Sequence, residues 1–153
     1  MTSIDSAMSQ TVTTMWESVL GTDIQTVGNE LTDVNREHSL VGCIHVTGPE
    51  GGVVTLECSD ALARTSASAM FHMSLEDVQS ADAEDSLGEL TNIIGGNFKA
   101  MLSDGHQLSL PTVVEGKDFR TRFIGTRLAS RVGFLCSGEP LVASFFREGA
   151  RAT

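Results

Sequence analysis

A glutamate and an asparagine three residues apart are the side chains of this sequence best suited to chemistry. Glu89 and Asn92 fall within a long stretch of helical periodicity, so we expect their Cβ atoms to lie about 5–6 Å apart on one helix face. The asparagine amide donates and accepts hydrogen bonds, so it can hold a water molecule in line with a phosphorus atom. The carboxylate can pair with a cation on a substrate. The pair suits hydrolysis of a reactive phosphoryl group, but E-x-x-N alone is too common to assign that activity.

The helix that positions this pair is predicted to run from about Ala83 to Ser103, where Asp104-Gly105 ends it. Two series of residues follow its 3.6-residue turn. The apolar series is predicted to pack against the fold: Leu87, Leu90, Ile94, Phe98 and Met101. The opposite series is predicted to face water or a partner: Asp85, Glu89, Asn92, Gly96 and Lys99.

Two adjacent glycines in this helix, Gly95 and Gly96, indicate a close approach. Each costs about 0.8–1.0 kcal/mol relative to alanine in a helix interior. The absence of a side chain would admit a partner molecule or a second helix of the same domain, and periodicity does not distinguish the two.

The remaining elements are expected to be a few helices and several short strands. Helices are predicted over 5–20 and from Ser59, as the N-cap, to about Met73, and a capping box is predicted at Ser74–Asp77. Strands are predicted at 40–46, 53–58, 108–114, 120–124, 128–136 and 141–146, with a weak one within 22–37. This order predicts an α+β fold, a two-layer sandwich of about six mostly antiparallel strands with long helices on one face.

Composition limits the class of protein. The 153 residues are 41% hydrophobic and 20% charged, with a formal net charge of -10. This length and composition are typical of a globular protein. We expect one domain covering 1–153, with a core of about 8–148 and flexible ends. The acidity argues against a nucleic-acid partner. No apolar run approaches the ~20 residues of a membrane helix, and the first residues do not resemble a secretion signal, so we expect a cytoplasmic protein without a membrane partner.

The charge is divided unevenly along the chain. Residues 1–98 contain 15 acidic and 2 basic residues, a sum of -13, whereas residues 99–153 contain 5 acidic and 8 basic residues, a sum of +3. Two differently solvated surfaces are the simplest interpretation.

Cysteines and histidines are not spaced as metal ligands usually are. No two cysteines form C-x-x-C and no two histidines lie four apart, so we expect buried reduced thiols, no metal site and no cofactor of the protein's own. A metal-dependent hydrolase is disfavoured for the same reason. The residues concerned are Cys43, Cys58, Cys136, His38, His45, His72 and His106.

The sequence around the helix resembles a known family. Glu89 to Lys99 reads ELTNIIGGNFK, and the segment after it, Leu108 to Gly116, reads LSLPTVVEG. Together they resemble the CheX branch of the CheC/CheX/FliY chemotaxis phosphatases, in which E-x-x-N and Gly-Asn precede a Ser-x-Pro-x-Val-x-x-Gly segment. Upstream similarity at MWESVLG (15–21) and GGVVTL (51–56) extends the resemblance over most of 8–148.

The resemblance implies a phosphatase that acts on the phospho-aspartate of a CheY-like response regulator. By that resemblance Asn92 would position the attacking water and Glu89 would pair with the receiver's lysine. Asp85, Gly96 and Lys99, on the same face of the helix, are expected to contact the partner. The Mg²⁺ of the reaction would belong to the receiver. One E-x-x-N, with no equivalent around Glu17, implies CheX and not the two-site CheC type. The resemblance also implies a homodimer joined at sheet edges, and leaves open a module that binds a receiver or flagellar-switch partner without catalysis.

Overall fold

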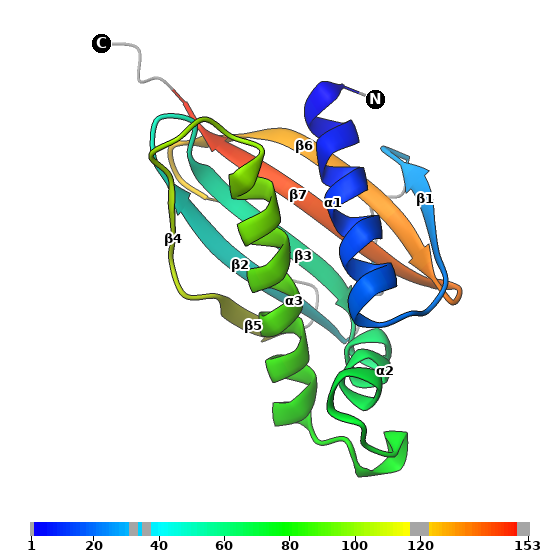
Figure 1. The fold of residues 1–153 in the computed structure, drawn as a ribbon. Helices are drawn as coiled ribbons and strands as arrows, with labels where there is room; N and C mark the ends of the chain where they lie inside the picture. The colour runs from blue at the N-terminus through cyan, green and yellow to red at the C-terminus, as the bar shows by residue number, and fades with distance from the viewer. Residues whose placement is uncertain (1, 31–33, 35–37, 117–122, 150–153) are drawn as a thin grey trace.

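The computed structural model describes residues 2–30, 34, 38–116 and 123–149 (Figure 1). In this part of the chain there are three α-helices and seven strands. The helices are α1 (Ser3–Val19), α2 (Asp60–Phe71) and α3 (Ser80–Ala100), with a single turn of 3-10 helix at Leu75–Asp77. The strands are β1 (Ile24–Gly28), β2 (Ser39–Thr47), β3 (Gly52–Ser59), β4 (Gln107–Leu108), β5 (Thr112–Gly116), β6 (Thr126–Cys136) and β7 (Glu139–Glu148).

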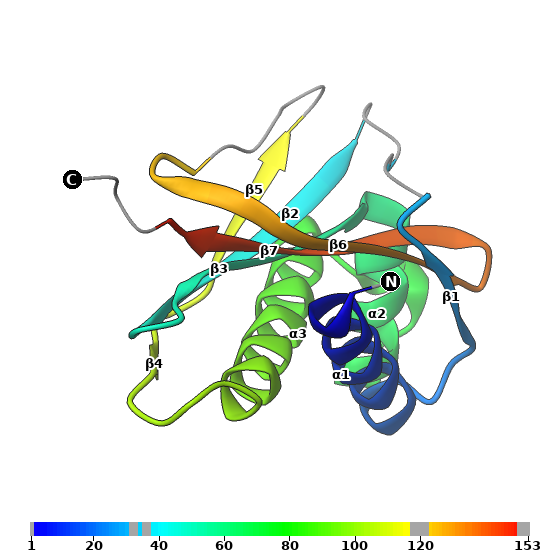
Figure 2. The same ribbon diagram turned by 90° about the horizontal axis from the view of Figure 1, so that it is seen from above.

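The strands form one sheet in the order β1-β6-β7-β3-β2-β4, and β5 pairs with β2 alongside β4. Every pairing among the described residues is antiparallel. All three helices lie on the same side of this sheet (Figure 2). The predicted α+β fold is therefore confirmed, with seven strands where about six were expected.

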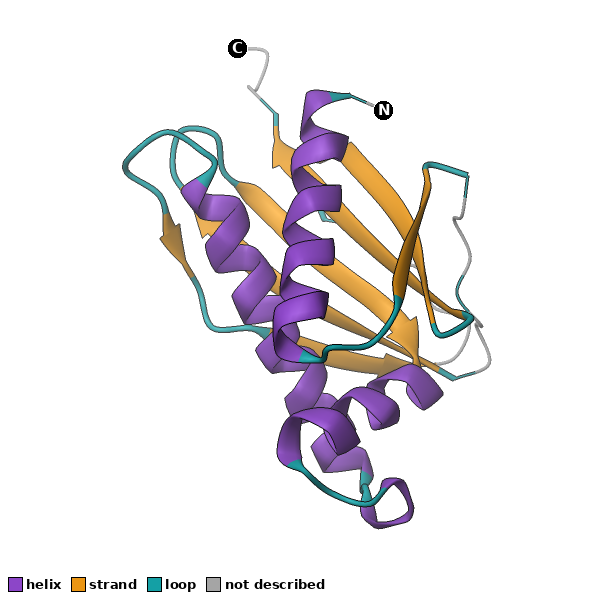
Figure 3. Cartoon of the chain, turned by 45° about the vertical axis from the view of Figure 1, so that its right-hand side comes forward, coloured by secondary structure: helices purple, strands orange, loops and turns teal. Residues whose placement is uncertain are grey.

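The core lies between the helix layer and the sheet. α1 and α3 lie next to each other over the strands (Figure 3). Phe98 of α3 packs on Phe145 of β7 with ring centroids 4.7 Å apart. Four of the five apolar residues predicted for α3 are at most 2% exposed, whereas Met101, the residue after its last turn, is 49% exposed. No helix in the described residues is long and apolar enough to cross a membrane.

Three local predictions differ from the structure. α2 ends at Phe71, because His72 adopts a left-handed conformation with a φ of 53° that stops the helix. Ser74 makes no capping hydrogen bond, so the capping box predicted there is wrong. α3 spans Ser80–Ala100, so it begins before the predicted Ala83 and ends before the predicted Ser103, with Met101 as its C-cap. At its start the Asp82 carboxylate accepts a hydrogen bond from the Gln79 N–H. The N-cap predicted at Ser59 is confirmed, since its hydroxyl accepts a hydrogen bond from the Leu62 N–H.

The strand predicted over 120–124 lies mostly outside the described residues. At its described end, Ile124 lies in a turn and is 98% exposed.

A buried carboxylate fixes the start of α1 to the sheet. Asp5 is 5% exposed. Its carboxylate accepts a hydrogen bond from the Thr2 N–H at 2.9 Å and another from the Ser130 hydroxyl of β6 at 2.5 Å. Burial alone would raise the pKa of Asp5, but the hydrogen bonds from Ser130, Thr2 and Asn29 outweigh it and hold the pKa below its ordinary 3.8.

We expect Asp5→Asn to lower the free energy of unfolding by about 1–2 kcal/mol at pH 7, because the cap of α1 and the bond to β6 are both weakened. A lowered folded-state pKa stabilises the protein above the unfolded pKa and loses that contribution as pH falls below about 4. Urea unfolding of both proteins at pH 7 and pH 3.5 measures this, and the difference should shrink at the lower pH. Asp23→Asn, at an exposed position, is the control; an equal loss in that variant would contradict the prediction.

Candidate functional site

Glu89 and Asn92 are both exposed and line the same open groove beside α3, about 690 Å³ in volume. The acidic residues of its lining, here called the acidic wall, come from α3. The apolar residues, here called the apolar wall, come from the end of α2, the segment before β5 and β5 itself. The lining residues are Phe71, Glu84, Asp85, Gly88, Glu89, Asn92, Leu110, Pro111 and Val113. In the part of the chain that the structure describes, no lysine or arginine lines the groove.

The height of α3 above the sheet is set by two reciprocal close approaches to β2. Thr91, fully buried, occupies the space where Gly42 lacks a side chain, and a Cβ on Gly42 would overlap the Thr91 hydroxyl. One turn later the roles are exchanged, because a Cβ on Gly95 would lie 2.7 Å from Cγ2 of Ile44. With both contacts made on the sheet side, the Glu89 and Asn92 face of the helix is turned to solvent.

The two adjacent glycines therefore have different surroundings. The lack of a side chain at Gly95 is explained by its packing against Ile44 of β2, so neither a partner molecule nor a second helix is needed to explain this glycine. A Cβ on Gly96 would lie 3.8 Å from Leu108, which is an ordinary contact.

The other predicted partner-binding residues are placed as follows. Asp85 is exposed and lines the groove one turn before Glu89. Gly96 and Lys99 are partly exposed and do not line it. Lys99 lies in the last turn of α3, where a cation stabilises the helix dipole.

The apolar wall arises where a predicted strand is interrupted. The prediction of one strand over 108–114 is wrong, since β4 and β5 are separated by Ser109, Leu110 and Pro111. The Ser109 hydroxyl accepts a hydrogen bond from the His45 N–H at 2.9 Å, so a side chain replaces a backbone acceptor of the ladder. Pro111 has no N–H to donate. Leu110 is 88% exposed at this break.

Comparisons with known proteins agree with this arrangement. The family model described as "Chemotaxis phosphatase CheX" matches residues 40–134, more than half of the chain. The chain belongs to the CheX family. No curated protein sequence matches it significantly.

Solved CheX structures share the fold at low sequence identity. A CheX from Desulfovibrio desulfuricans is 20% identical with a TM-score of 0.76, covering 96% of this chain and 100% of that one. A CheX from Vibrio vulnificus is 15% identical with a TM-score of 0.76, covering 96% and 97%. The CheX–CheY–BeF3–Mg²⁺ complex from Borrelia burgdorferi contains a chain that is 15% identical with a TM-score of 0.71, covering 94% and 97%.

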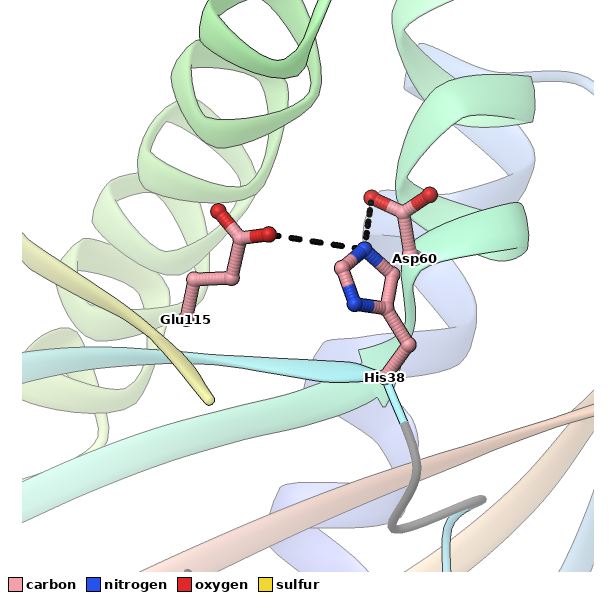
Figure 4. Close-up of side chains that lie close together, drawn as sticks. All are labelled: His38, Asp60 and Glu115. Carbon is pink, nitrogen blue, oxygen red and sulfur yellow. Dashed lines mark ion pairs between the residues drawn. The ribbon is translucent and has the colours of Figure 1, made fainter. Parts of the chain in front are cut away.

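Outside the groove, this CheX-family chain has a second cluster of polar side chains that sequence spacing did not indicate. His38, Asp60 and Glu115 each present one potential ligand atom, and these atoms lie within 4.8 Å of one another (Figure 4). They come from three segments far apart in the sequence, so no local motif identifies them.

The cysteines are free thiols, as expected. Cys58 and Cys136 are buried, and Cys43 is partly exposed. Burial raises the pKa of all three, that of Cys136 to about 12, so these thiols are poor nucleophiles.

The two glycines of α3 provide a matched test of the packing. Both gain about 0.8–1.0 kcal/mol of helix propensity on substitution by alanine. We expect Gly96→Ala to be stabilised by up to about that amount, whereas Gly95→Ala should be about 1–3 kcal/mol less stable than Gly96→Ala, because its methyl group overpacks against buried Ile44. Urea unfolding measures both. Equal stabilities would mean that α3 is not held against β2 at Gly95.

Proposed function

We propose that this protein hydrolyses the phospho-aspartate of a CheY-like receiver domain. The observation that supports the proposal is the pair Glu89 and Asn92, exposed together on one face of α3 and lining an open groove. Membership of a family described as chemotaxis phosphatases agrees with it, as does the Borrelia CheX structure, which was solved with CheY, BeF3 and Mg²⁺.

Asn92 is proposed to position the attacking water. Its amide can accept a hydrogen bond from a water molecule and donate one to a phosphoryl oxygen, which places the water in line with the phosphorus. Water attacks phosphorus and the P–O bond to the receiver's aspartate breaks, giving inorganic phosphate and free carboxylate. The Mg²⁺ that neutralises the phosphoryl oxygens is proposed to be the receiver's, so this chain supplies no metal to the reaction.

Glu89 is proposed to pair with the receiver's active-site lysine. No cation of its own chain is paired with Glu89 among the described residues, so its carboxylate is available to an incoming ammonium. One turn before it, Asp85 extends the same acidic wall. Gly96 and Lys99 are proposed as contacts farther along α3, where Gly96 leaves room for the receiver backbone.

A homodimer through sheet edges remains a proposal from the family resemblance. β1 offers one edge of the sheet, and β4 and β5, which both pair with β2, form the other. Val113 of β5 lines the groove whereas no residue of β1 is in its described lining, so a dimer joined through β1 would leave the groove accessible to a receiver.

Asn92→Ala is expected to slow phosphate release from a phosphorylated receiver by about 100-fold or more, because the water is no longer held in line. Phosphate release is measured with the purified receiver alone, with the wild type and with the variant. The matched control is Asn97→Ala, since Asn97 is also exposed on α3 but does not line the groove. Full activity in Asn92→Ala would refute the mechanism.

Glu89→Ala is expected to weaken binding to a receiver held in the phosphorylated state by beryllofluoride, by about 10-fold or more, since one charge-assisted contact is lost. Isothermal titration calorimetry measures the affinity, and Glu17→Ala, an exposed glutamate on α1, is the control. Unchanged affinity in Glu89→Ala would contradict the pairing with lysine.

The two assays also distinguish a phosphatase from a binding module. Binding by the wild type without accelerated phosphate release would favour a receiver-binding module and overturn the catalytic proposal. Acceleration that depends on Asn92 would support it.

A further inference from the structure

The cluster of His38, Asp60 and Glu115 lies at one end of three neighbouring strands. His38 immediately precedes β2, Asp60 begins α2 directly after β3, and Glu115 lies near the end of β5. Strand register brings them together: Ser39 pairs with Ser59, and Leu40 pairs with Glu115. The Asp60 N–H also donates to the His38 carbonyl oxygen at 3.1 Å. The positions of the three residues are thus fixed by the backbone ladder of the fold.

Both carboxylates converge on a single nitrogen. The Nε2 atom of His38 lies 3.4 Å from Oδ1 of Asp60 and 3.4 Å from Oε1 of Glu115 (Figure 4). Both distances exceed the ordinary N–H···O range of about 2.7–3.2 Å. Nε2 carries at most one hydrogen whether the imidazole is neutral or charged, so it cannot donate well to two acceptors at once.

The two N···O distances match the spacing of ligand atoms in a tetrahedral metal site, and all three ligand atoms lie within 4.8 Å of one another. Zn²⁺ binds imidazole nitrogen at about 2.0–2.1 Å and carboxylate oxygen at about 2.0–2.2 Å. Two ligands at these bond lengths and a tetrahedral angle are about 3.4 Å apart. Both N···O separations of the cluster have this value.

One of the candidate ligands is held in orientation by its neighbours. Oδ2 of Asp60 accepts a hydrogen bond from Nε of Arg64 at 2.7 Å, which leaves Oδ1 directed to His38. Arg64 is itself fixed, since its other nitrogens donate to the Val78 carbonyl oxygen and the Ser80 hydroxyl. Outer contacts of this kind orient the ligands of metal sites.

From this arrangement we propose that His38, Asp60 and Glu115 bind a divalent transition-metal cation of the Zn²⁺ type, with water as the fourth ligand. The imidazole favours such a cation over Mg²⁺, which prefers oxygen ligands in an octahedral shell. Two carboxylates neutralise the charge of the ion. The side chain of His38 is 53% exposed, so the site is open to ions from solvent.

The bound ion would join β5 to the start of α2. β5 also contains Val113, which lines the α3 groove, but none of the three ligands does. The ion is therefore assigned a stabilising role separate from the proposed phosphatase chemistry, and its test requires no receiver.

The test is titration of the purified, metal-free protein with ZnCl₂ by isothermal titration calorimetry, and in parallel with MgCl₂. We expect one saturable Zn²⁺ site, no comparable Mg²⁺ site, and a rise in melting temperature with Zn²⁺. His38→Ala and Glu115→Gln should each weaken Zn²⁺ binding by at least about 10-fold, and His38→Ala should abolish the rise in melting temperature.

Two control variants separate this site from adventitious binding. His72→Asn removes another exposed histidine at a left-handed position that asparagine tolerates. Cys43→Ser removes the partly exposed thiol. Both should bind Zn²⁺ as the wild type does. Absence of Zn²⁺ binding, unchanged affinity in His38→Ala, or loss of the site in either control would overturn the proposal.

Discussion

The close approach of α3 to β2 is the constraint on which the groove depends. The space for it is provided from both sides, by Gly42 in the strand beneath Thr91 and by Gly95 in the helix above Ile44. Two contacts one turn apart fix the rotation of the helix as well as its height. Since successive residues turn by about 100°, a helix with Thr91 and Gly95 against the sheet has Asn92 on its flank and Glu89 farther round toward solvent, and both are exposed. The exposure of the proposed catalytic face therefore follows from packing on the opposite face.

Periodicity in the sequence predicts this helix well, because the burial of each residue depends on which face of the helix it occupies, and the spacing along the sequence gives that face. Leu87, Leu90, Ile94 and Phe98 are buried as the 3.6-residue pattern requires, and Glu89 and Asn92 are exposed. The role of Gly95 could not be predicted in the same way. The space left at Gly95 is filled by Ile44, about fifty positions earlier in the chain. A single sequence does not show that these two residues are in contact, so it could not tell whether a partner, a helix or a strand fills the space.

Features built from several segments could not be predicted from the sequence for the same reason. The break at Ser109–Pro111 depends on a serine hydroxyl that replaces the ladder acceptor of His45, a contact between strands. Phe71 and Leu110 both line the groove although they come from α2 and from the segment before β5, far apart in the sequence. The cluster at His38 depends on the register of β2 with both β3 and β5. A hydrophobic pattern indicates a strand but does not specify its partners, and these sites depend on the partners.

The charge of the groove constrains how a phosphorylated partner could be recognised. Among the described residues, its lining includes Glu84, Asp85 and Glu89 and no basic residue, on a chain of net charge -10. A receiver with an acidic pocket and a phosphoryl group would gain no long-range attraction from such a surface, and beyond the Debye length of about 8 Å the field is screened in any case. Recognition would then have to come from contacts made at short range. A receiver lysine that reaches Glu89, together with an apolar receiver surface against Leu110, would supply such contacts. Specificity would then come from complementary shape and individual charge pairs and not from electrostatic steering.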